Sequence, residues 1–179
     1  MLPGPTIKAF DAHLVAGGLS LEAIVIGGSA LALLGVTSRQ TRDFDIIAPE
    51  LSTTILDAAR AFAKEQRRNG VDLIDDWLNN GPAQLADLLP DGWRLRTQLA
   101  FAGTALTLHA LGRADLLKTK LFALCDRGTD LPDCIALAPT ADELDDARPW
   151  VSLQDANPDW PRHVVETFAD LSRRLGHGV

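Results

Sequence analysis

In the first half of the chain, segments with apolar residues at helical spacing alternate with short apolar runs typical of strands. Apolar residues three and four apart predict a helix that Gly17-Gly18 ends, and a short apolar run then predicts a buried strand. A loop over 36–42 leads to a second strand, and Ser52 is a suitable N-cap for the helix that follows. The expected elements are, in order, a helix over 6–16, a strand over 21–26, a helix over 29–34, a strand over 43–47 and a helix over 53–66.

Between residues 70 and 112 the apolar segments are short, and the last two have the composition of β-strands. These two runs meet at Gly103-Thr104, where a reversal is favoured, so we expect a β-hairpin. Trp77 lies in a polar loop, where it either stacks on a ligand ring or packs in the core. The expected segments are an apolar element over 71–74, a polar loop over 75–80, one helical turn over 85–89, and β-runs over 93–101 and 105–111.

The C-terminal third of the chain shows helical spacing. Asp130 and Pro132 open one helix, the T-x-x-E pattern of Thr140–Glu143 predicts a capping box for the next, and Pro161 introduces the last. The expected helices run over 113–125, from about 130, over 140–147 and from 161 to Gly176. The whole pattern predicts an α+β (mixed α/β) fold, with a small mixed sheet flanked by helices.

Composition limits the domain organisation and the class of partner. With 179 residues, of which 46% are hydrophobic, the chain fits a core over 1–112 with a C-terminal helical part over 113–179 packed on it as a single compact unit. A net charge of -7 disfavours a surface that coats nucleic acid. No apolar stretch reaches the roughly 20 residues of a membrane span. The start at 1–5 lacks the features of a signal peptide, so we expect a cytoplasmic protein without membrane contact.

Cysteine usage argues against a zinc site and a disulfide framework. The two cysteines, Cys125 and Cys134, have no CxxC spacing and no nearby pair of histidines. We therefore expect both to be small core residues.

The first candidate for chemistry is the Gly27-Gly28-Ser29 turn after the first strand. Two glycines allow backbone N–H groups to approach an anion closely, and a helix that starts at Ser29 directs unpaired amides and its positive dipole end outward. The Ser29 hydroxyl adds a further donor. This turn is expected to bind phosphate.

The second candidate is the D-x-D pattern of Asp43 and Asp45 at the second strand. Residues two apart on a strand project to the same face, so both carboxylates point one way while Phe44 and Ile46 face the core. Two adjacent carboxylates repel unless a cation joins them, and an incomplete set of oxygen ligands suits Mg²⁺ held together with substrate phosphates. Either motif alone occurs by chance, as a solvated loop or a helix cap. Their combination indicates phosphoryl or nucleotidyl chemistry.

Two ionisable residues in the second half need a separate explanation. On a helical wheel Lys120 falls between Leu116 and Leu124, inside the apolar arc, so its ammonium either reaches the surface along the core or meets a carboxylate or phosphate. Asp130 is placed to cap the next helix, with Asp133 in its first turn. Lys120 and Asp130 are expected to lie close enough to share a cleft.

Taken together, these motifs resemble the DNA polymerase β-like nucleotidyltransferase superfamily. The chain looks most similar to a bacterial branch related to the AbiEii-type toxins of toxin–antitoxin systems, and to a sister family of unknown substrate that carries a WLN element, matched here by 77–79. The resemblance spans roughly 21–144 and implies the minimal nucleotidyltransferase fold. Its matched residues are Gly28, Ser29, Asp43 and Asp45, with Arg39 and Thr41 in the loop between them, and later Lys120, Asp130 and Asp133.

The resemblance implies a mechanism and its participants. Gly27, Gly28 and Ser29 would hold the phosphates of a nucleoside triphosphate, and Asp43 and Asp45 would bind Mg²⁺, or Mn²⁺ in its place. A nucleoside monophosphate would pass to a hydroxyl acceptor, either an RNA end or a protein side chain. Arg39, Thr41 and Lys120 would contact the nucleotide, and Asp130 would orient Lys120 or activate the acceptor. A role as a toxin restrained by an antitoxin protein follows from the same branch.

One departure from the superfamily pattern leaves an alternative open. Polymerase-type members add a third carboxylate on a later strand, but 93–111 contains no Asp or Glu. Asp72, Asp75, Asp76 or Asp130 supplies this charge, or the site binds one metal weakly, or catalysis is lost. The alternative is an inactive module that binds a nucleotide or a partner protein. A dinucleotide-binding fold fits less well because no G-x-G-x-x-G is present.

Overall fold

The computed structural model describes residues 3–177. Met1 and Leu2, which begin the segment where no signal peptide is expected, lie outside the described residues. The chain divides into two compact units, Met1–Gly112 and Arg113–Val179. Within the part of the chain that is described, no helix is both long and apolar enough to cross a membrane.

The first unit is built on a mixed five-stranded sheet with the order β3-β2-β1-β5-β4. β1 is antiparallel to β2 and parallel to β5, while β2 is parallel to β3 and β4 is antiparallel to β5. The strands are β1 (Leu21–Ile26), β2 (Phe44–Ala48), β3 (Leu78–Asn79), β4 (Gln98–Ala102) and β5 (Leu106–Ala110). This small mixed sheet with its flanking helices confirms the predicted fold class and is consistent with a minimal nucleotidyltransferase fold.

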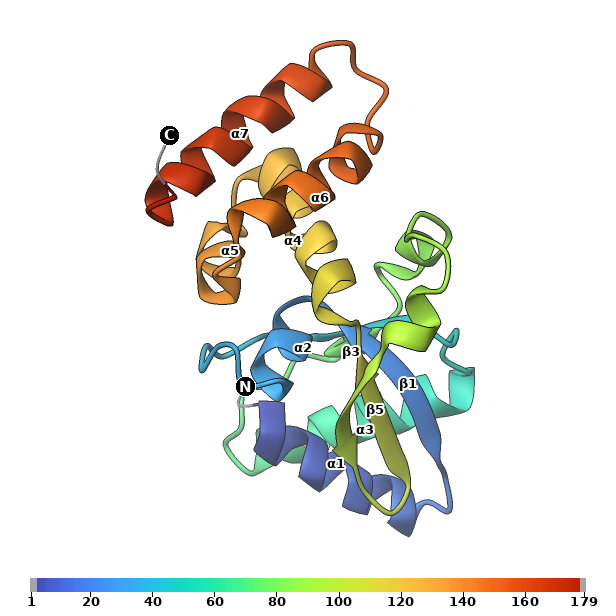
Figure 1. The fold of residues 1–179 in the computed structure, drawn as a ribbon. Coiled ribbons are helices and arrows are strands. Elements are labelled where there is room, and N and C mark those ends of the chain that lie inside the picture. Colours follow the sequence, from blue (N-terminus) through green and yellow to red (C-terminus); the bar gives the residue numbers. More distant parts are fainter. Residues whose placement is uncertain (1–2, 178–179) are drawn as a thin grey trace. The chain divides into compact units, whose positions relative to one another are not determined.

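Two helices pack along one face of this sheet, α1 (Pro3–Ala16) and α3 (Thr53–Arg68) (Figure 1). Between them and the sheet lies an aromatic cluster, in which Trp77 meets Phe10, Phe44 and Phe62 at ring distances of 5.0, 5.8 and 5.6 Å. Trp77 is fully buried, and its Nε1 donates a hydrogen bond to the Ala59 carbonyl. Of the two roles considered for Trp77, the structure shows core packing.

Several expected boundaries in the first unit are wrong, each for a local reason. α2 (Gly27–Leu33) begins at the glycines rather than at Ser29, because the chain turns directly after β1. No helix or strand forms over 71–74, and β3 lies in the expected polar loop; a two-residue strand has no period to detect. The first helix begins at Pro3 rather than at residue 6. Two short 3-10 helices also differ from the expectation: η1 (Ala83–Asp87) lies where a helical turn over 85–89 was expected, and η2 (Trp93–Arg96) takes the start of the β-run expected over 93–101.

The β-hairpin of β4 and β5 is confirmed, and α1 holds its turn. Asp11 on α1 accepts hydrogen bonds from the backbone amides of Thr104, Ala105 and Leu106 at 3.1, 2.8 and 2.8 Å. These bonds, the one from Ala105 first, lower the pKa of Asp11 against the opposing effect of burial. Asp11 therefore ties the first helix to the end of the sheet.

The described part of the second unit, residues 113–177, contains four helices with their own buried core. They are α4 (Arg113–Arg127), α5 (Leu131–Leu137), α6 (Ala141–Ser152) and α7 (Trp160–Arg174). The capping box is confirmed, since Thr140 Oγ1 accepts from the Glu143 amide at 3.1 Å and Glu143 Oε2 accepts from the Thr140 amide at 2.9 Å. The expected end of α6 near 147 is wrong: the helix continues through Pro149 to bury Val151.

Both cysteines are buried and free, as expected. Burial raises the pKa of the Cys125 thiol to about 11 and that of Cys134 to about 12. Because the thiolate is the reactive form, neither thiol is activated for nucleophilic chemistry at neutral pH.

Candidate functional site

The glycines after β1 form a corner into which one of the two carboxylates fits. Gly27 has a φ of +73°, a backbone conformation that favours glycine. An ideal Cβ at this position would lie only 2.9 Å from Asp45 Oδ2. Any larger residue at 27 would therefore both strain the backbone and displace the carboxylate. The Asp45 side chain lies directly against the glycine corner.

Strand register explains why Asp45 is found there. Asp45 of β2 pairs with Ile26, the last residue of β1, so it lies one residue from Gly27. Phe44 and Ile46 are fully buried among the core residues. Alternation along β2 then directs Asp45 to the face opposite α1 and α3. This is the orientation that the D-x-D spacing predicts.

Asp43 is joined to the same corner through Thr41. The Thr41 hydroxyl lies 3.1 Å from the Asp43 carbonyl oxygen and 3.4 Å from Asp43 Oδ1. An ideal Cβ on Gly28 would lie 3.6 Å from Thr41 Oγ1 and 3.4 Å from Arg39 Nη2. A guanidinium and a hydroxyl thus stand beside the second glycine. The structure brings together Gly27, Gly28, Arg39, Thr41, Asp43 and Asp45.

Ser29 contributes differently from the expectation. Its hydroxyl donates to the Ile26 carbonyl at 3.1 Å, and the residue is 1% exposed. This bond lies within the first turn of α2 and uses the hydroxyl proton. Any contact of Ser29 with a phosphate would therefore come from its backbone amide.

Asn79 is a site residue that sequence reasoning did not select. It pairs with Asp45 in the β2–β3 register, and its Nδ2 lies 3.3 Å from Asp45 Oδ1. The other amide atom, Oδ1, accepts from the Gly81 amide at 2.7 Å, which fixes Nδ2 as the group facing the carboxylate. The available signal was the WLN element: buried Trp77 and Leu78 anchor the short strand, and Asn79 faces Asp45.

We predict opposite effects for two substitutions of Asn79. Asn79→Ala removes the donor that orients Asp45, so affinity for Mn²⁺ in the presence of a nucleoside triphosphate should fall several-fold. Asn79→Asp keeps an acceptor for Gly81 and adds a third carboxylate, so metal affinity should rise, because oxygen ligands with more negative charge bind divalent ions more tightly. Titration followed by electron paramagnetic resonance of free Mn²⁺ measures both. Equal affinity in the two variants would contradict a role for Asn79 at the carboxylates.

Three of the residues considered for a third carboxylate, Asp72, Asp75 and Asp76, do not gather with Asp43 and Asp45 into a metal-binding group among the described residues. Asp75 forms an ion pair with Arg67 at 2.6 Å, and Asp72 and Asp76 are exposed. Within residues 3–177 no three His, Cys, Asp or Glu side chains gather as a group that could hold a metal ion. The strand beside Asp45 carries the neutral Asn79 instead.

Lys120 and Asp130 belong to the second unit, where they are bonded to each other. Lys120 Nζ donates to Asp130 Oδ1 at 2.8 Å and to Asp133 Oδ2 at 2.6 Å. The three side chains are 7%, 8% and 2% exposed. Of the alternatives for Lys120, the structure shows carboxylate partners. Asp130 stands at the N-cap position of α5, but its side chain makes no capping bond, so the capping interpretation is wrong.

The pKa directions in this cluster follow from its ion pairs. Burial opposes both charges, yet the hydrogen bonds and charges of Asp130 and Asp133 raise the pKa of Lys120. In the same way Lys120, aided by Arg127, lowers the pKa of Asp130 despite burial. Among the described residues, the Lys120 ammonium is bonded to the carboxylates of Asp130 and Asp133. Contact of Lys120 or Asp130 with a triphosphate stays a prediction from the resemblance.

Comparison with known protein families identifies the family of the chain. Residues 7–138 match the model of a family described as "Nucleotidyltransferase of unknown function (DUF6036)". The chain belongs to this nucleotidyltransferase family. The matched range includes the sheet, the glycine corner, both carboxylates and the Lys120 cluster. No curated protein and no solved structure matches the chain.

Proposed function

We propose that this member of the DUF6036 family is an Mg²⁺-dependent nucleotidyltransferase that moves a nucleoside monophosphate from a nucleoside triphosphate to a hydroxyl acceptor. One observation carries the proposal: Asp45 lies against Gly27 with Asp43 linked through Thr41 to Gly28. Carboxylates and a glycine turn in direct contact are what a metal-bound triphosphate needs. The family supports the same chemistry.

The donor's phosphates are proposed to bind at Gly27 and Gly28. Glycine leaves the backbone amides of the corner open to a close anion, and Arg39 and Thr41 add a cation and a hydroxyl beside them. Arg39 is exposed, so it can follow a flexible triphosphate. These residues hold the β and γ phosphates and thereby place the α-phosphorus near the carboxylates.

The carboxylates fit a hard divalent ion. Asp43 and Asp45 supply oxygen ligands only, and Gly27 leaves room where a Cβ would collide with Asp45 Oδ2. When bound, Mg²⁺, or Mn²⁺ in its place, neutralises charge that develops on the phosphates. Asn79 keeps Asp45 oriented toward this position. Both carboxylates are half-buried, and alternation along β2 directs Asp45 to the face of the sheet opposite α1 and α3.

The reaction requires the chain to hold two reactants in line. The acceptor oxygen forms a bond to the α-phosphorus, the bond to the bridging oxygen breaks, pyrophosphate leaves, and the hydroxyl proton passes to water. The glycine corner and Arg39 retain the leaving pyrophosphate, so their contribution is positioning and charge stabilisation. RNA ends and protein side chains both offer the hydroxyl, and a toxin restrained by an antitoxin is the biological role that the resemblance favours.

Nucleotide binding tests the proposal most directly. The melting temperature is measured with ATP, CTP, GTP and UTP, each at a saturating concentration, with and without Mg²⁺. At least one nucleotide should raise the melting temperature only when Mg²⁺ is present, because a ligand of the native state stabilises it by mass action. Asp43→Asn should remove this shift. Asp72→Asn, which makes the same charge change at an exposed position, should keep it. A shift that is independent of Mg²⁺ and of Asp43 would contradict the proposal.

A specific observation favours one second candidate, an inactive binding module. Among the described residues the corner holds two carboxylates and the neutral Asn79 where a third could stand. Such a module would bind the nucleotide or a partner protein but transfer nothing. Stabilisation by Mg²⁺ and a nucleotide, without label incorporation into any acceptor, would identify it.

A further inference from the structure

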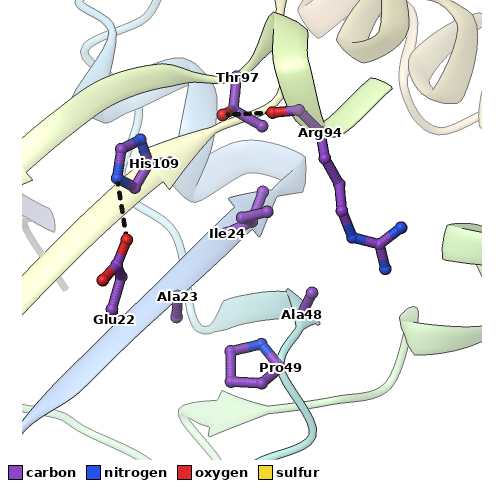
Figure 2. Close-up of a pocket in the computed structure, with 8 residues that line it drawn as sticks. All are labelled: Glu22, Ala23, Ile24, Ala48, Pro49, Arg94, Thr97 and His109. Atoms are coloured by element: carbon purple, nitrogen blue, oxygen red, sulfur yellow. Dashed lines mark hydrogen bonds and ion pairs between the residues drawn. The ribbon is translucent and has the colours of Figure 1, made fainter. Parts of the chain in front are cut away.

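A pocket of about 590 Å³ lies on the first unit, away from the glycine corner. It is large enough for a drug-sized or nucleotide-sized molecule. Figure 2 shows its side chains, which come from β1, the end of β2 and the residue after it, β5, and η2 with its C-cap residue Thr97. Its lining includes the polar and charged residues Glu22, Arg94, Thr97 and His109 and the apolar residues Ile24 and Pro49.

Strand register places this pocket on the same face of the sheet as Asp45. Ile26 pairs with Asp45, and Ile24, two residues earlier on β1, projects to the same side. Ile24 in turn pairs with His109 on β5. Two residues of strand span about 7 Å, and the next strand lies about 5 Å away. The pocket therefore begins roughly one nucleotide's length from the carboxylates.

Arg94 places a guanidinium in the lining of the pocket, where it can bind an anion. Its guanidinium lies 4.3 Å from the centre of the Trp93 ring, and Trp93 is buried and donates from Nε1 to the Ala86 carbonyl. The Thr97 hydroxyl donates to the Arg94 carbonyl at 3.0 Å, which orders the backbone. Between residues 3 and 177 no carboxylate pairs with Arg94. Its forked N–H donors can therefore bind a phosphate at two points.

The opposite wall of the pocket offers groups that bind hydroxyls. His109 Nε2 lies 3.6 Å from Glu22 Oε1, and the His109 side chain is 28% exposed. Carboxylate and imidazole together accept and donate hydrogen bonds, as a ribose diol requires. Ile24 and Pro49 provide an apolar floor on which a base can lie (Figure 2).

We propose that this pocket binds the acceptor and that the acceptor is the end of an RNA strand, whose phosphate contacts Arg94 and whose ribose contacts His109 and Glu22. The inference rests on the proposed function and names its second substrate. The donor's phosphates already have the glycine corner and Arg39, so the Arg94 guanidinium, which lines a separate pocket on the same face, indicates a second phosphate-bearing molecule. A protein side chain would carry no phosphate for Arg94.

The test measures RNA binding without any nucleotide or metal. Fluorescence anisotropy of an eight-nucleotide oligouridine, labelled at its 5′ end, should show binding that Arg94→Ala weakens at least tenfold and Arg94→Lys weakens less. His109→Ala should weaken it several-fold, and the deoxy form of the oligonucleotide should bind several-fold more weakly to wild type. Arg68→Ala, an equal charge change at an exposed position on α3, is the control and should bind as wild type does.

The nucleotide-binding assay separates this inference from the proposed function. Arg94→Ala should keep the Mg²⁺-dependent shift with a nucleoside triphosphate, and Asp43→Asn should keep RNA binding. Loss of nucleotide binding in Arg94→Ala would instead assign the pocket to the donor's nucleoside and overturn the inference. It is also overturned if Arg94→Ala and Arg68→Ala bind RNA equally, or if label passes to a protein while RNA is not bound. None of these results alters the Asp43 test.

Discussion

Replacement of both Asp43 and Asp45 by asparagine is expected to lower nucleotide transfer by about 1,000-fold. Loss of the carboxylates removes the ligands that bring a divalent ion to the α-phosphate, and charge stabilisation of this kind contributes several kcal/mol to the transition state. About 4 kcal/mol corresponds to a factor of 1,000 in rate. The measurement is incorporation of label from nucleoside triphosphates into cell RNA and lysate proteins, with wild type and variant compared side by side.

Stability separates this loss of activity from a loss of fold. Asparagine nearly matches aspartate in shape, and it relieves repulsion between two half-buried carboxylates. The double variant without ligand should therefore melt at the same temperature as wild type or higher. Asp72→Asn is the matched control and should leave incorporation unchanged. Equal incorporation by the double variant and wild type would remove the basis for assigning the transferase.

Lys120→Met is expected to lower the free energy of unfolding of the second unit by about 3–5 kcal/mol. The substitution leaves Asp130 and Asp133, 8% and 2% exposed, as buried carboxylates without their ammonium partner. Urea denaturation followed by far-UV circular dichroism measures the change. Lys118→Met, on the same helix but without a carboxylate partner among the described residues, should change stability by about 0.5 kcal/mol or less.

A compensating variant shows whether unpaired charge is the cause. Lys120→Met combined with Asp130→Asn and Asp133→Asn carries no charge at these three positions and should recover much of the lost stability. A triple variant as unstable as Lys120→Met alone would show that Lys120 acts through packing instead. Incorporation of label by the triple variant would also show that Lys120 is not required at the triphosphate.

The pH dependence of this cluster has a definite sign. The pKa of Asp130 is lower in the folded state, so its stabilising contribution is complete above the unfolded pKa and is lost as the pH falls through the folded value. The pKa of Lys120 is raised, so its contribution is complete below the unfolded pKa and is lost as the pH rises through the folded value. Wild type should lose stability at both extremes relative to the neutral triple variant.

The glycine corner could be predicted from the sequence because each part has a strong local signal. A glycine pair after an apolar run marks the turn, and D-x-D before a second run fixes the face on which the carboxylates lie. Antiparallel pairing of β1 and β2 then places Asp45 beside Gly27. The contact between Asp45 and Gly27 is predictable because the two residues lie close together in the sequence, at the facing ends of consecutive strands.

Other contacts depend on partners that no local pattern identifies. Asn79 reaches Asp45 only because β3, a two-residue strand, adds in parallel to β2. The helical wheel predicts the interior position of Lys120. It does not predict that the partners of Lys120 are Asp130 and Asp133, because this depends on how α5 packs on α4. The composition of 93–101 predicts one strand because Trp and Thr suit β-structure. Gly92, in a left-handed conformation, is instead the N-cap of η2, and the strand starts at Gln98.

The three hydrogen bonds that Asp11 accepts from backbone amides have a consequence for folding during biosynthesis. Asp11 and its partners lie 93 to 95 positions apart, and β1 gains its parallel neighbour β5 only when residues 106–110 exist. A nascent chain that has not yet emerged from the ribosome through Ala110 lacks both connections. The sheet should therefore form late in translation, and stalled fragments ending before β5 should be digested readily by protease.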